Sequence, residues 1–226
     1  MGYIKLALYK VFSYDKIPST QTMATDMIAK RQAGDHTVIV AAAQSDGRGR
    51  FRRKWVSHHG NLYASFIYAC EERDARLSYA IAIAVADTLF SFGIVPTIKW
   101  PNDILVDDKK ISGILIEYFG RFVVVGIGIN IATNPTVAEY KTTKIHDFVM
   151  ANEKDVLARL MKFLDKWIRA DFAIVRERWM SMATGLNTTV RYRGATAQLM
   201  GINENGALVL RCGTRYVLAY GDEILI

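Results

Sequence analysis

Lys99-Trp100-Pro101-Asn102-Asp103 stands between two apolar runs, and a second group of polar and small residues follows it at Lys110 and Gly113-Ile114-Leu115. Pro, Asn and Asp favour turns, so this part of the chain predicts two strands joined by a turn. Charge, amide and glycine gathered at such a turn indicate a functional site. The alternative is a surface hairpin in which the same residues only provide turn chemistry.

A second polar segment follows the apolar run Val38–Ala43 and reads Gln44-Ser45-Asp46-Gly47-Arg48-Gly49-Arg50-Phe51-Arg52-Arg53-Lys54-Trp55. Four arginines and one lysine lie within seven residues of it. Arginine offers a planar fork of donors to phosphate or carboxylate oxygens, and glycine lets the backbone approach the same anion. The segment therefore predicts an anion-binding loop. A solvated basic loop or a nucleic-acid patch is the alternative.

Together the two segments resemble the biotin protein ligase family, in which a Gly-Arg-Gly-Arg loop ending in Trp precedes a Lys-Trp-Pro-Asn-Asp strand end and a Lys-x-x-Gly-Ile-Leu strand. Ser19-Thr20 at the head of the first helix, Gly126-Ile127-Gly128-Ile129-Asn130 and a β-rich tail from about Leu186 to Ile226 extend the resemblance over nearly the whole chain. Two positions depart from the family pattern. Gln21 stands where Asn is usual, and Arg52 stands where Gly is usual.

The resemblance implies an α+β fold with two domains. Residues 1–184 would form a class II aminoacyl-tRNA synthetase-like catalytic domain, with a mixed sheet flanked by helices. Residues 185–226 would form a small C-terminal SH3-like β-barrel, and turn signals at Arg193-Gly194, Asn205-Gly206 and Cys212-Gly213 fit its short strands.

Local patterns predict several elements of the first domain. A strand is expected near Ile4–Phe12, and a helix from Gln21 to Arg31 begins after the capping residues Ser19 and Thr20. The apolar run Leu77–Phe92 predicts a buried core helix, and the runs 111–119 and 121–131 predict a hairpin about Gly120. Apolar residues from Glu153 to Met180 recur at helical spacing.

Length and composition fit a folded protein with one sizeable core, since the 226 residues are 51% hydrophobic. The net charge of +7 suits nucleic acid, but it equally suits an enzyme that binds ATP and docks on an acidic carrier protein. Cys70 and Cys212 lie in apolar runs and predict buried free thiols. Met1–Val11 has no signal-peptide pattern and the Leu77–Phe92 helix is short for a membrane span, so a cytoplasmic location without membrane contact is expected.

The activity implied by the resemblance is ATP-dependent biotinylation. Biotin and ATP would give biotinyl-5′-AMP and pyrophosphate, with Mg²⁺ present, and the biotinyl group would pass to a lysine of a biotin carboxyl carrier protein or domain of acetyl-CoA carboxylase or a related carboxylase. A carboxylate needs such activation because its leaving group would otherwise be oxide. The monofunctional type, without an N-terminal DNA-binding domain or a DNA partner, is expected, and dimerisation stays open. The alternatives are a lipoate or octanoate protein ligase and a basic nucleic-acid-binding module.

Cations are needed where the biotin carboxylate meets the α-phosphate. The resemblance places Lys110 between these two anions and puts Arg48 and Arg50 in a loop that orders over the ligand. Asn102 and Asp103 would position the nucleotide, Mg²⁺ or the acceptor amine.

The remaining site residues would bind the biotin end. Ser19, Thr20 and Gln44 suit a polar ureido ring, Trp55 suits the thiophane ring and valeryl chain, and glycine at positions 113 and 128 allows close approach. Lys110, Arg50 and Asp103 are the predicted catalytic residues, and no metal site of the protein's own is predicted. The predicted substrate-binding set is Ser19, Thr20, Gln44, Gly47, Arg48, Gly49, Arg50, Trp55, Lys99, Asn102, Lys110, Gly113, Gly128 and Asn130.

Overall fold

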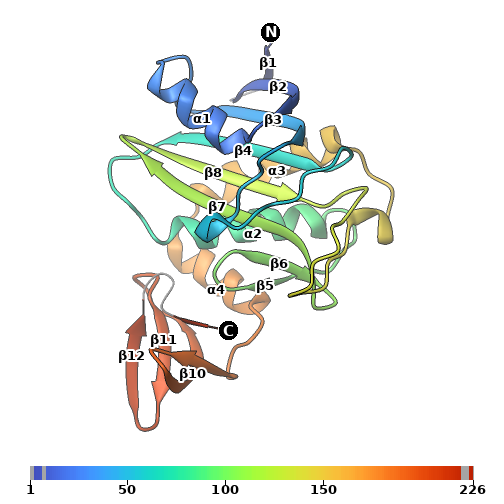
Figure 1. Cartoon of the computed structure of the whole chain (residues 1–226). Helices are drawn as coiled ribbons and strands as arrows, with labels where there is room; N and C mark the ends of the chain where they lie inside the picture. The colour runs from blue at the N-terminus through green and yellow to red at the C-terminus, as the bar shows by residue number, and fades with distance from the viewer. Residues whose placement is uncertain (1–2, 7–8, 220–223, 226) are drawn as a thin grey trace. The chain divides into compact units, whose positions relative to one another are not determined.

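The computed structural model describes residues 3–6, 9–219 and 224–225 (Figure 1). These residues fall into two compact units. The first unit takes the described residues up to Arg73 together with Asp108–Ala158, and the second takes Asp74–Asp107 together with the described residues from Arg159 onward. The division at 184/185 stays a prediction.

A mixed sheet forms the centre of the first unit. Its strands run in the order β1-β2-β3-β4-β8-β7. The β2–β3 pair is parallel and the other neighbouring pairs are antiparallel. The strands are β1 (Tyr3–Leu6), β2 (Tyr9–Ile17), β3 (Thr37–Gln44), β4 (Leu62–Ala69), β7 (Lys109–Phe119) and β8 (Phe122–Ile129).

Helix α1 (Thr20–Ala29) joins the parallel strands β2 and β3 and packs on β3, β4 and β8 (Figure 1). Its apolar residues Ala24, Met27 and Ile28 are buried against Ile39 and Ile67 of the sheet. Burying this apolar face stabilises the helix and places its N-terminus against the ends of the strands.

The second unit contains helix α2 (Leu77–Phe90), the antiparallel strands β5 (Thr97–Lys99) and β6 (Asp103–Val106), the part of α3 (Glu153–Ile168) from Arg159 onward, and α4 (Phe172–Met182). Every residue of α2 from Tyr79 to Leu89 is buried, as the apolar run predicts. Asp87 of α2 accepts hydrogen bonds from Trp167 Nε1 at 2.9 Å and Arg178 Nη2 at 2.7 Å. A paired carboxylate therefore links α2 to α3 and α4, whereas an unpaired one would be costly to bury.

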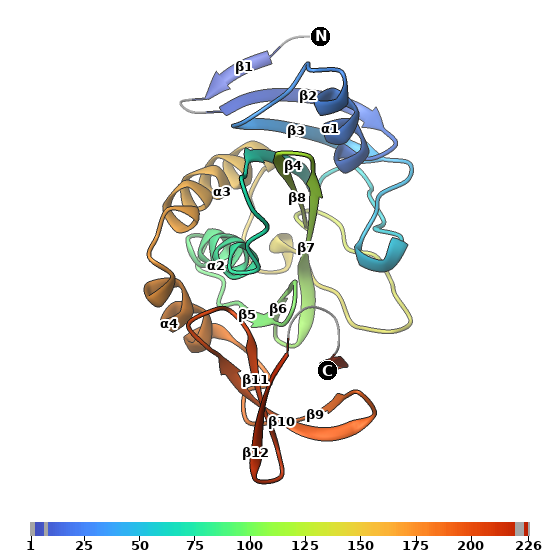
Figure 2. The same ribbon diagram turned by 90° about the vertical axis from the view of Figure 1, so that its left-hand side faces the viewer.

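The C-terminal strands form an antiparallel sheet in the order β12-β11-β10-β9-β13 (Figure 2). They are β9 (Thr189–Tyr192), β10 (Ala195–Ile202), β11 (Leu208–Cys212), β12 (Arg215–Ala219) and β13 (Ile224–Leu225). This sheet is attached to the helices of its own unit, since the Tyr79 hydroxyl donates to Gly206 O at 2.9 Å and Arg176 Nε donates to Ile202 O at 2.6 Å. The α+β class is confirmed. The described strands make an open sheet, so the SH3-like barrel stays a prediction.

The predicted hairpin about Gly120 and the three predicted turns of the C-terminal sheet are present. Three expectations need correction. The N-terminal strand is two antiparallel strands, because alternation of side chains does not reveal a chain reversal; residues 7–8 lie outside the described residues. The helical stretch 153–180 is interrupted, because Asp171 caps a new helix by accepting from Ala173 N at 2.7 Å. Cys70 and Cys212 are half-buried free thiols.

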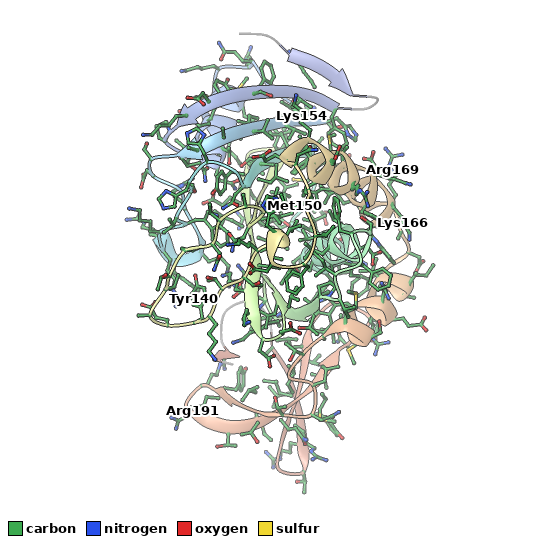
Figure 3. All side chains as sticks on the ribbon, turned by 90° about the vertical axis from the view of Figure 1, so that its right-hand side faces the viewer. Tyr140, Met150, Lys154, Lys166, Arg169 and Arg191 are labelled. Atoms are coloured by element: carbon green, nitrogen blue, oxygen red, sulfur yellow. The ribbon has the colours of Figure 1, made fainter. Side chains whose placement is uncertain are left out.

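Three basic side chains are exposed here, Lys154 and Lys166 of α3 and Arg169 directly after the helix (Figure 3). Over the described residues, no helix combines the length and the apolar character that crossing a bilayer requires.

Candidate active site

The start of α1 and the end of β3 meet through the side chain of Gln44. Ser19 caps α1 with its hydroxyl, which accepts from Gln21 N at 3.2 Å. Gln44 Oε1 accepts from Thr20 N at 2.8 Å and lies 3.2 Å from Thr20 Oγ1, while Gln44 Nε2 donates to Ser57 Oγ at 2.8 Å. The predicted residues Ser19, Thr20 and Gln44 are therefore brought together.

The basic loop closes on itself after β3. Trp55 N donates to Gly47 O at 2.8 Å, and Gly49 N donates to Arg53 O at 2.7 Å. A Cβ on Gly47 would lie 2.4 Å from Trp55 O, so the loop needs glycine there for its own packing. The short 3-10 helix η1 (Arg50–Arg52) forms its tip.

Two tip residues of this loop have left-handed backbone conformations. Phe51 has φ 55° and Arg52 has φ 58°. This region favours glycine, because a Cβ crowds the neighbouring carbonyl there. The departure at Arg52 thus places an arginine where the backbone geometry suits glycine.

The loop arginines contact neighbouring side chains. Arg48 Nη2 lies 3.4 Å from Glu117 Oε2 of β7, in a pair of which both side chains are about two-fifths exposed. The Arg50 guanidinium lies 5.2 Å from the ring centre of Phe51, a side chain with 67% exposure. The loop thus holds its cations on the surface of the first unit, within reach of solvent.

Trp55 lies against a flat strip of the sheet formed by two glycines. Gly113 of β7 and Gly128 of β8 are paired across the two strands. A Cβ on Gly128 would lie 2.6 Å from the Trp55 indole, and one on Gly113 would lie 2.9 Å from it. Neither position accepts a side chain without displacing the indole, so both glycines let Trp55 approach the backbone closely. Their approach to a ligand stays a prediction.

Lys110 is the second residue of the same strand β7. Its Nζ lies 5.4 Å from the ring centre of Trp55 and 5.0 Å from that of Tyr140, a residue on the loop after β8 (Figure 3). Lys110 N donates to Lys141 O at 2.9 Å, and Lys110 O accepts from Thr143 N at 3.0 Å. The backbone is thus held on both sides, and the ammonium group is placed beside the indole.

Asn130 is buried at the end of β8. Its Nδ2 donates to Thr143 O at 3.0 Å. Within the part of the chain that the structure describes, Asn130 Oδ1 and Trp55 Nε1 are buried without a hydrogen-bond partner. Buried polar atoms are normally satisfied, so both are available to water or to a ligand.

The other predicted residues belong to the second unit. Lys99 and Asp103 are paired across β5 and β6, and Asn102 lies in the turn between them, after the cis peptide bond Trp100–Pro101. Trp100 is buried and hydrogen-bonds the Tyr79 hydroxyl, so it is a core aromatic. Burial raises the pKa of Tyr79 to about 12. The participation of Lys99, Asn102 and Asp103 in one site with Lys110 and Arg50 stays a prediction.

Gln21, Ser57, Ser65, Glu117 and Tyr140 contact the predicted residues but were not predicted themselves. Ser65 had a signal in the sequence, because it is a polar residue inside the apolar run Leu62–Ala69. Glu117 and Tyr140 had none. Among the described residues, no three His, Cys, Asp or Glu side chains are grouped as they would be around a metal ion.

A family model described as "Biotin/lipoate A/B protein ligase family" matches residues 14–134, more than half of the chain. The chain belongs to this biotin/lipoate ligase family. Among similar family members, the bifunctional ligase/repressor BirA of Bacillus subtilis is 31% identical, over 93% of this chain and 72% of that protein. The biotin--[acetyl-CoA-carboxylase] ligase of Paracoccus denitrificans is also 31% identical, over 76% of this chain and 83% of that protein.

Solved structures of ligases agree with this assignment. The biotin protein ligase from Aquifex aeolicus in complex with biotin and ATP has a TM-score of 0.84 and 26% identity to this chain, and the comparison covers 95% of this chain and 97% of that one. The mixed sheet and its helices therefore have the biotin protein ligase fold.

Proposed function

We propose that the protein is an ATP-dependent biotin protein ligase that makes biotinyl-5′-AMP and transfers the biotinyl group to a lysine of a carrier domain. One observation carries the proposal. The glycine pair, Trp55 and Lys110 form a single cluster in the first unit, in a chain similar to proteins named biotin--[acetyl-CoA-carboxylase] ligase.

The first unit offers the groups that biotin needs. The Gly113–Gly128 strip and the Trp55 indole suit the flat apolar bicycle, which packs best against an aromatic face and bare backbone. Thr20 and Gln44 suit the ureido ring, which presents N–H donors and a carbonyl acceptor. We assign this end of the cluster to the biotin ring.

The charges suit the adenylation step. The biotin carboxylate attacks the α-phosphate of ATP, a new carbon-oxygen-phosphorus anhydride forms, and pyrophosphate leaves with the electron pair of the broken bond. Two anions approach each other in this step, so fixed cations lower its barrier. Lys110 is the proposed cation between them, and Arg48 and Arg50 are the proposed cations of the covering loop.

The second step needs an acceptor amine without its proton. The lysine nitrogen of the carrier attacks the acyl carbon, AMP leaves, and the amine loses its proton. Asp103 and Asn102 are proposed to position the nucleotide or this amine, since a carboxylate can orient an ammonium group and accept its proton. Arg50 and its loop are proposed to exclude water from the adenylate meanwhile.

Mg²⁺ is proposed to accompany ATP. In nucleotide sites this ion is held by phosphate oxygens, waters and one or two carboxylates, so it does not require an acidic cluster. Asp103 is the proposed carboxylate.

The finer features of the partner and fold are also proposals. The acceptor is proposed to be the biotin carboxyl carrier protein or domain of acetyl-CoA carboxylase or a related carboxylase, with no DNA or membrane partner. An SH3-like barrel made by the C-terminal strands and a cytoplasmic location complete the proposal, and dimerisation stays open.

Exchange of labelled pyrophosphate into ATP tests the proposal, with purified protein, Mg²⁺ and either biotin, lipoate or octanoate. Exchange with biotin alone is the expected result, because only biotin has a ureido ring for Thr20 and Gln44. Exchange with lipoate or octanoate alone would assign the site to the other acid class of the family. Failure to exchange with any of the three acids would refute the proposed adenylation.

A further inference from the structure

Gln21 sends its side chain from the first turn of α1 into the sheet. The residue is 2% exposed. Its Nε2 donates to Val124 O of β8 at 3.0 Å, and its Oε1 lies 2.9 Å from Ser65 Oγ of β4. The bond to a carbonyl fixes which end of the amide is the donor, so Oε1 must face Ser65.

The sheet is shaped to receive this amide. Ser65 and Gly126 are paired directly across β4 and β8. A Cβ on Gly126 would lie 2.7 Å from Gln21 Oε1, a distance that real Cβ atoms essentially never show. The bare backbone at Gly126 therefore lets the Gln21 amide lie on the sheet.

Ser65 connects this amide to the proposed biotin site. Ser65 Oγ lies 2.9 Å from Thr20 Oγ1 as well as from Gln21 Oε1. Thr20 Oγ1 in turn lies 3.2 Å from Gln44 Oε1. The side chains of Gln21, Ser65, Thr20 and Gln44 thus form one continuous hydrogen-bonded chain.

The number of hydroxyl protons decides which group donates in each bond of this hydrogen-bonded chain. Each hydroxyl has one proton, and a carbonyl oxygen can only accept. Gln21 Oε1 therefore accepts a hydrogen bond from the Ser65 hydroxyl. The Ser65 hydroxyl then cannot also donate to Thr20. The Thr20 hydroxyl donates instead to Gln44 Oε1 or to Ser65 Oγ. In either case Thr20 Oγ1 keeps an acceptor lone pair that Ser65 would otherwise occupy.

We infer that Gln21 is a positioning and specificity-determining residue, which holds the Ser65 proton and so leaves both lone pairs of the Thr20 hydroxyl free of Ser65 and open to an N–H group of the ligand. This inference rests on the proposed function. The ureido ring of biotin has such N–H groups, whereas the ring of lipoate has none. Gln21 itself lies behind Thr20 and acts without touching the ligand.

Two variants change the hydrogen-bonded chain of side chains at different points. Gln21→Leu removes the acceptor at similar volume, and Ser65→Ala removes the connecting hydroxyl. Thr25→Ala is the matched control, because Thr25 lies one turn further along α1 and its hydroxyl bonds Thr22 O and Gln21 O of the helix itself. Pyrophosphate exchange by the purified full chain gives KM for biotin, KM for ATP and kcat, and thermal unfolding gives Tm.

Gln21→Leu is expected to raise the KM for biotin three- to tenfold, about the value of one neutral hydrogen bond, because the Ser65 hydroxyl then donates to Thr20 Oγ1. Ser65→Ala should keep the KM for biotin near that of the wild type, because no hydroxyl is left to donate to Thr20. KM for ATP and kcat should change less than twofold, and Thr25→Ala should resemble the wild type. The double variant should have the KM for biotin of Ser65→Ala, because without the Ser65 hydroxyl the loss of the Gln21 acceptor releases no donor toward Thr20.

Gly126→Ala provides an independent variant that keeps every polar group. The added Cβ pushes Gln21 Oε1 away from Ser65, so the same selective rise in KM for biotin is expected.

Two results overturn the inference while leaving the proposed function intact. The first is an unchanged KM for biotin in Gln21→Leu, or a double variant as impaired as Gln21→Leu, while the wild type exchanges with biotin. The second is a parallel change of both KM values and kcat in step with a lower Tm, which would mean a purely structural role. A wild type that exchanges with none of the acids refutes the proposed function itself, and the inference falls with it.

Discussion

Replacing Gly128 by alanine tests the proposed biotin site most directly. The added Cβ would lie 2.6 Å from the Trp55 indole, whereas an ordinary contact begins at about 3.4 Å. The indole must therefore move by about 0.8 Å, or the strand must shift by the same amount. Gly128 lies in a regular strand and needs no positive φ, so the substitution acts through this contact alone.

The cost of the change follows from its size. Crowding a well-packed site by one methyl group costs about 1–3 kcal/mol. If the displaced indole enters the space of the biotin ring, most of this free-energy cost is lost from the binding of biotin. At about 1.4 kcal/mol for each factor of ten, KM for biotin should rise about five- to hundredfold, with a much smaller change in KM for ATP.

The assay is biotin-dependent pyrophosphate exchange, with Tm measured on the same samples. Gly34→Ala is the matched control, because its Cβ would meet only ordinary contacts, the nearest at 3.8 Å from Phe122. A folded Gly128→Ala protein whose KM for biotin equals that of the wild type would contradict the reasoning and move the biotin ring away from Trp55.

Three further predictions concern charge and pH. Lys110→Ala should lose adenylate formation by a factor of at least about a hundred, since a cation between two anions is removed, and pyrophosphate exchange near the wild-type rate would exclude Lys110 from catalysis. Arg50→Gly should form the adenylate but release it; labelling of unrelated lysines by biotin and ATP measures this, and wild-type retention of labelled adenylate would count against the loop role. Burial raises the pKa of Tyr79 to about 12, from an ordinary value of 10, so the neutral form is favoured in the folded state. Its contribution to stability is complete below pH 10 and is lost as pH rises from 10 to 12, by at most about 2–3 kcal/mol; urea unfolding between pH 9 and 11.5 should show this loss, and Tyr79→Phe should show less of it.

Elements with a strong local pattern were predictable from the sequence. The run Leu77–Phe92 has no polar side large enough for solvent, so a buried helix was its expected structure, and Gly120 marked the hairpin turn. The break at Asp171 was harder to predict, because the apolar spacing on either side of it remains helical. Helix α3 ends at Ile168, and Asp171 caps the start of α4.

The candidate site also contains residues that the local sequence predicted and residues that it did not. Thr20, Gln44, Trp55, Lys110 and the two glycines were expected from short motifs, and the structure of the first unit brings them together. Glu117 and Tyr140 became neighbours of this group only through tertiary contacts, and on their own they resemble ordinary strand and loop residues. Gln21 is the clearest case, since its partners Ser65 and Val124 lie 44 and 103 residues away in the chain.

The contacts of Asp87 have a consequence for the order in which the second unit forms during synthesis. Its partners Trp167 and Arg178 are made 80 and 91 residues after it. At a synthesis rate of roughly 5–20 residues per second, both partners have been synthesised only about 5–20 s after Asp87. Throughout that interval the ribosome presents an almost wholly apolar helix with an unpaired carboxylate. Any factor that shields exposed apolar segments of nascent chains should engage this protein there, and its engagement should end once α4 has emerged.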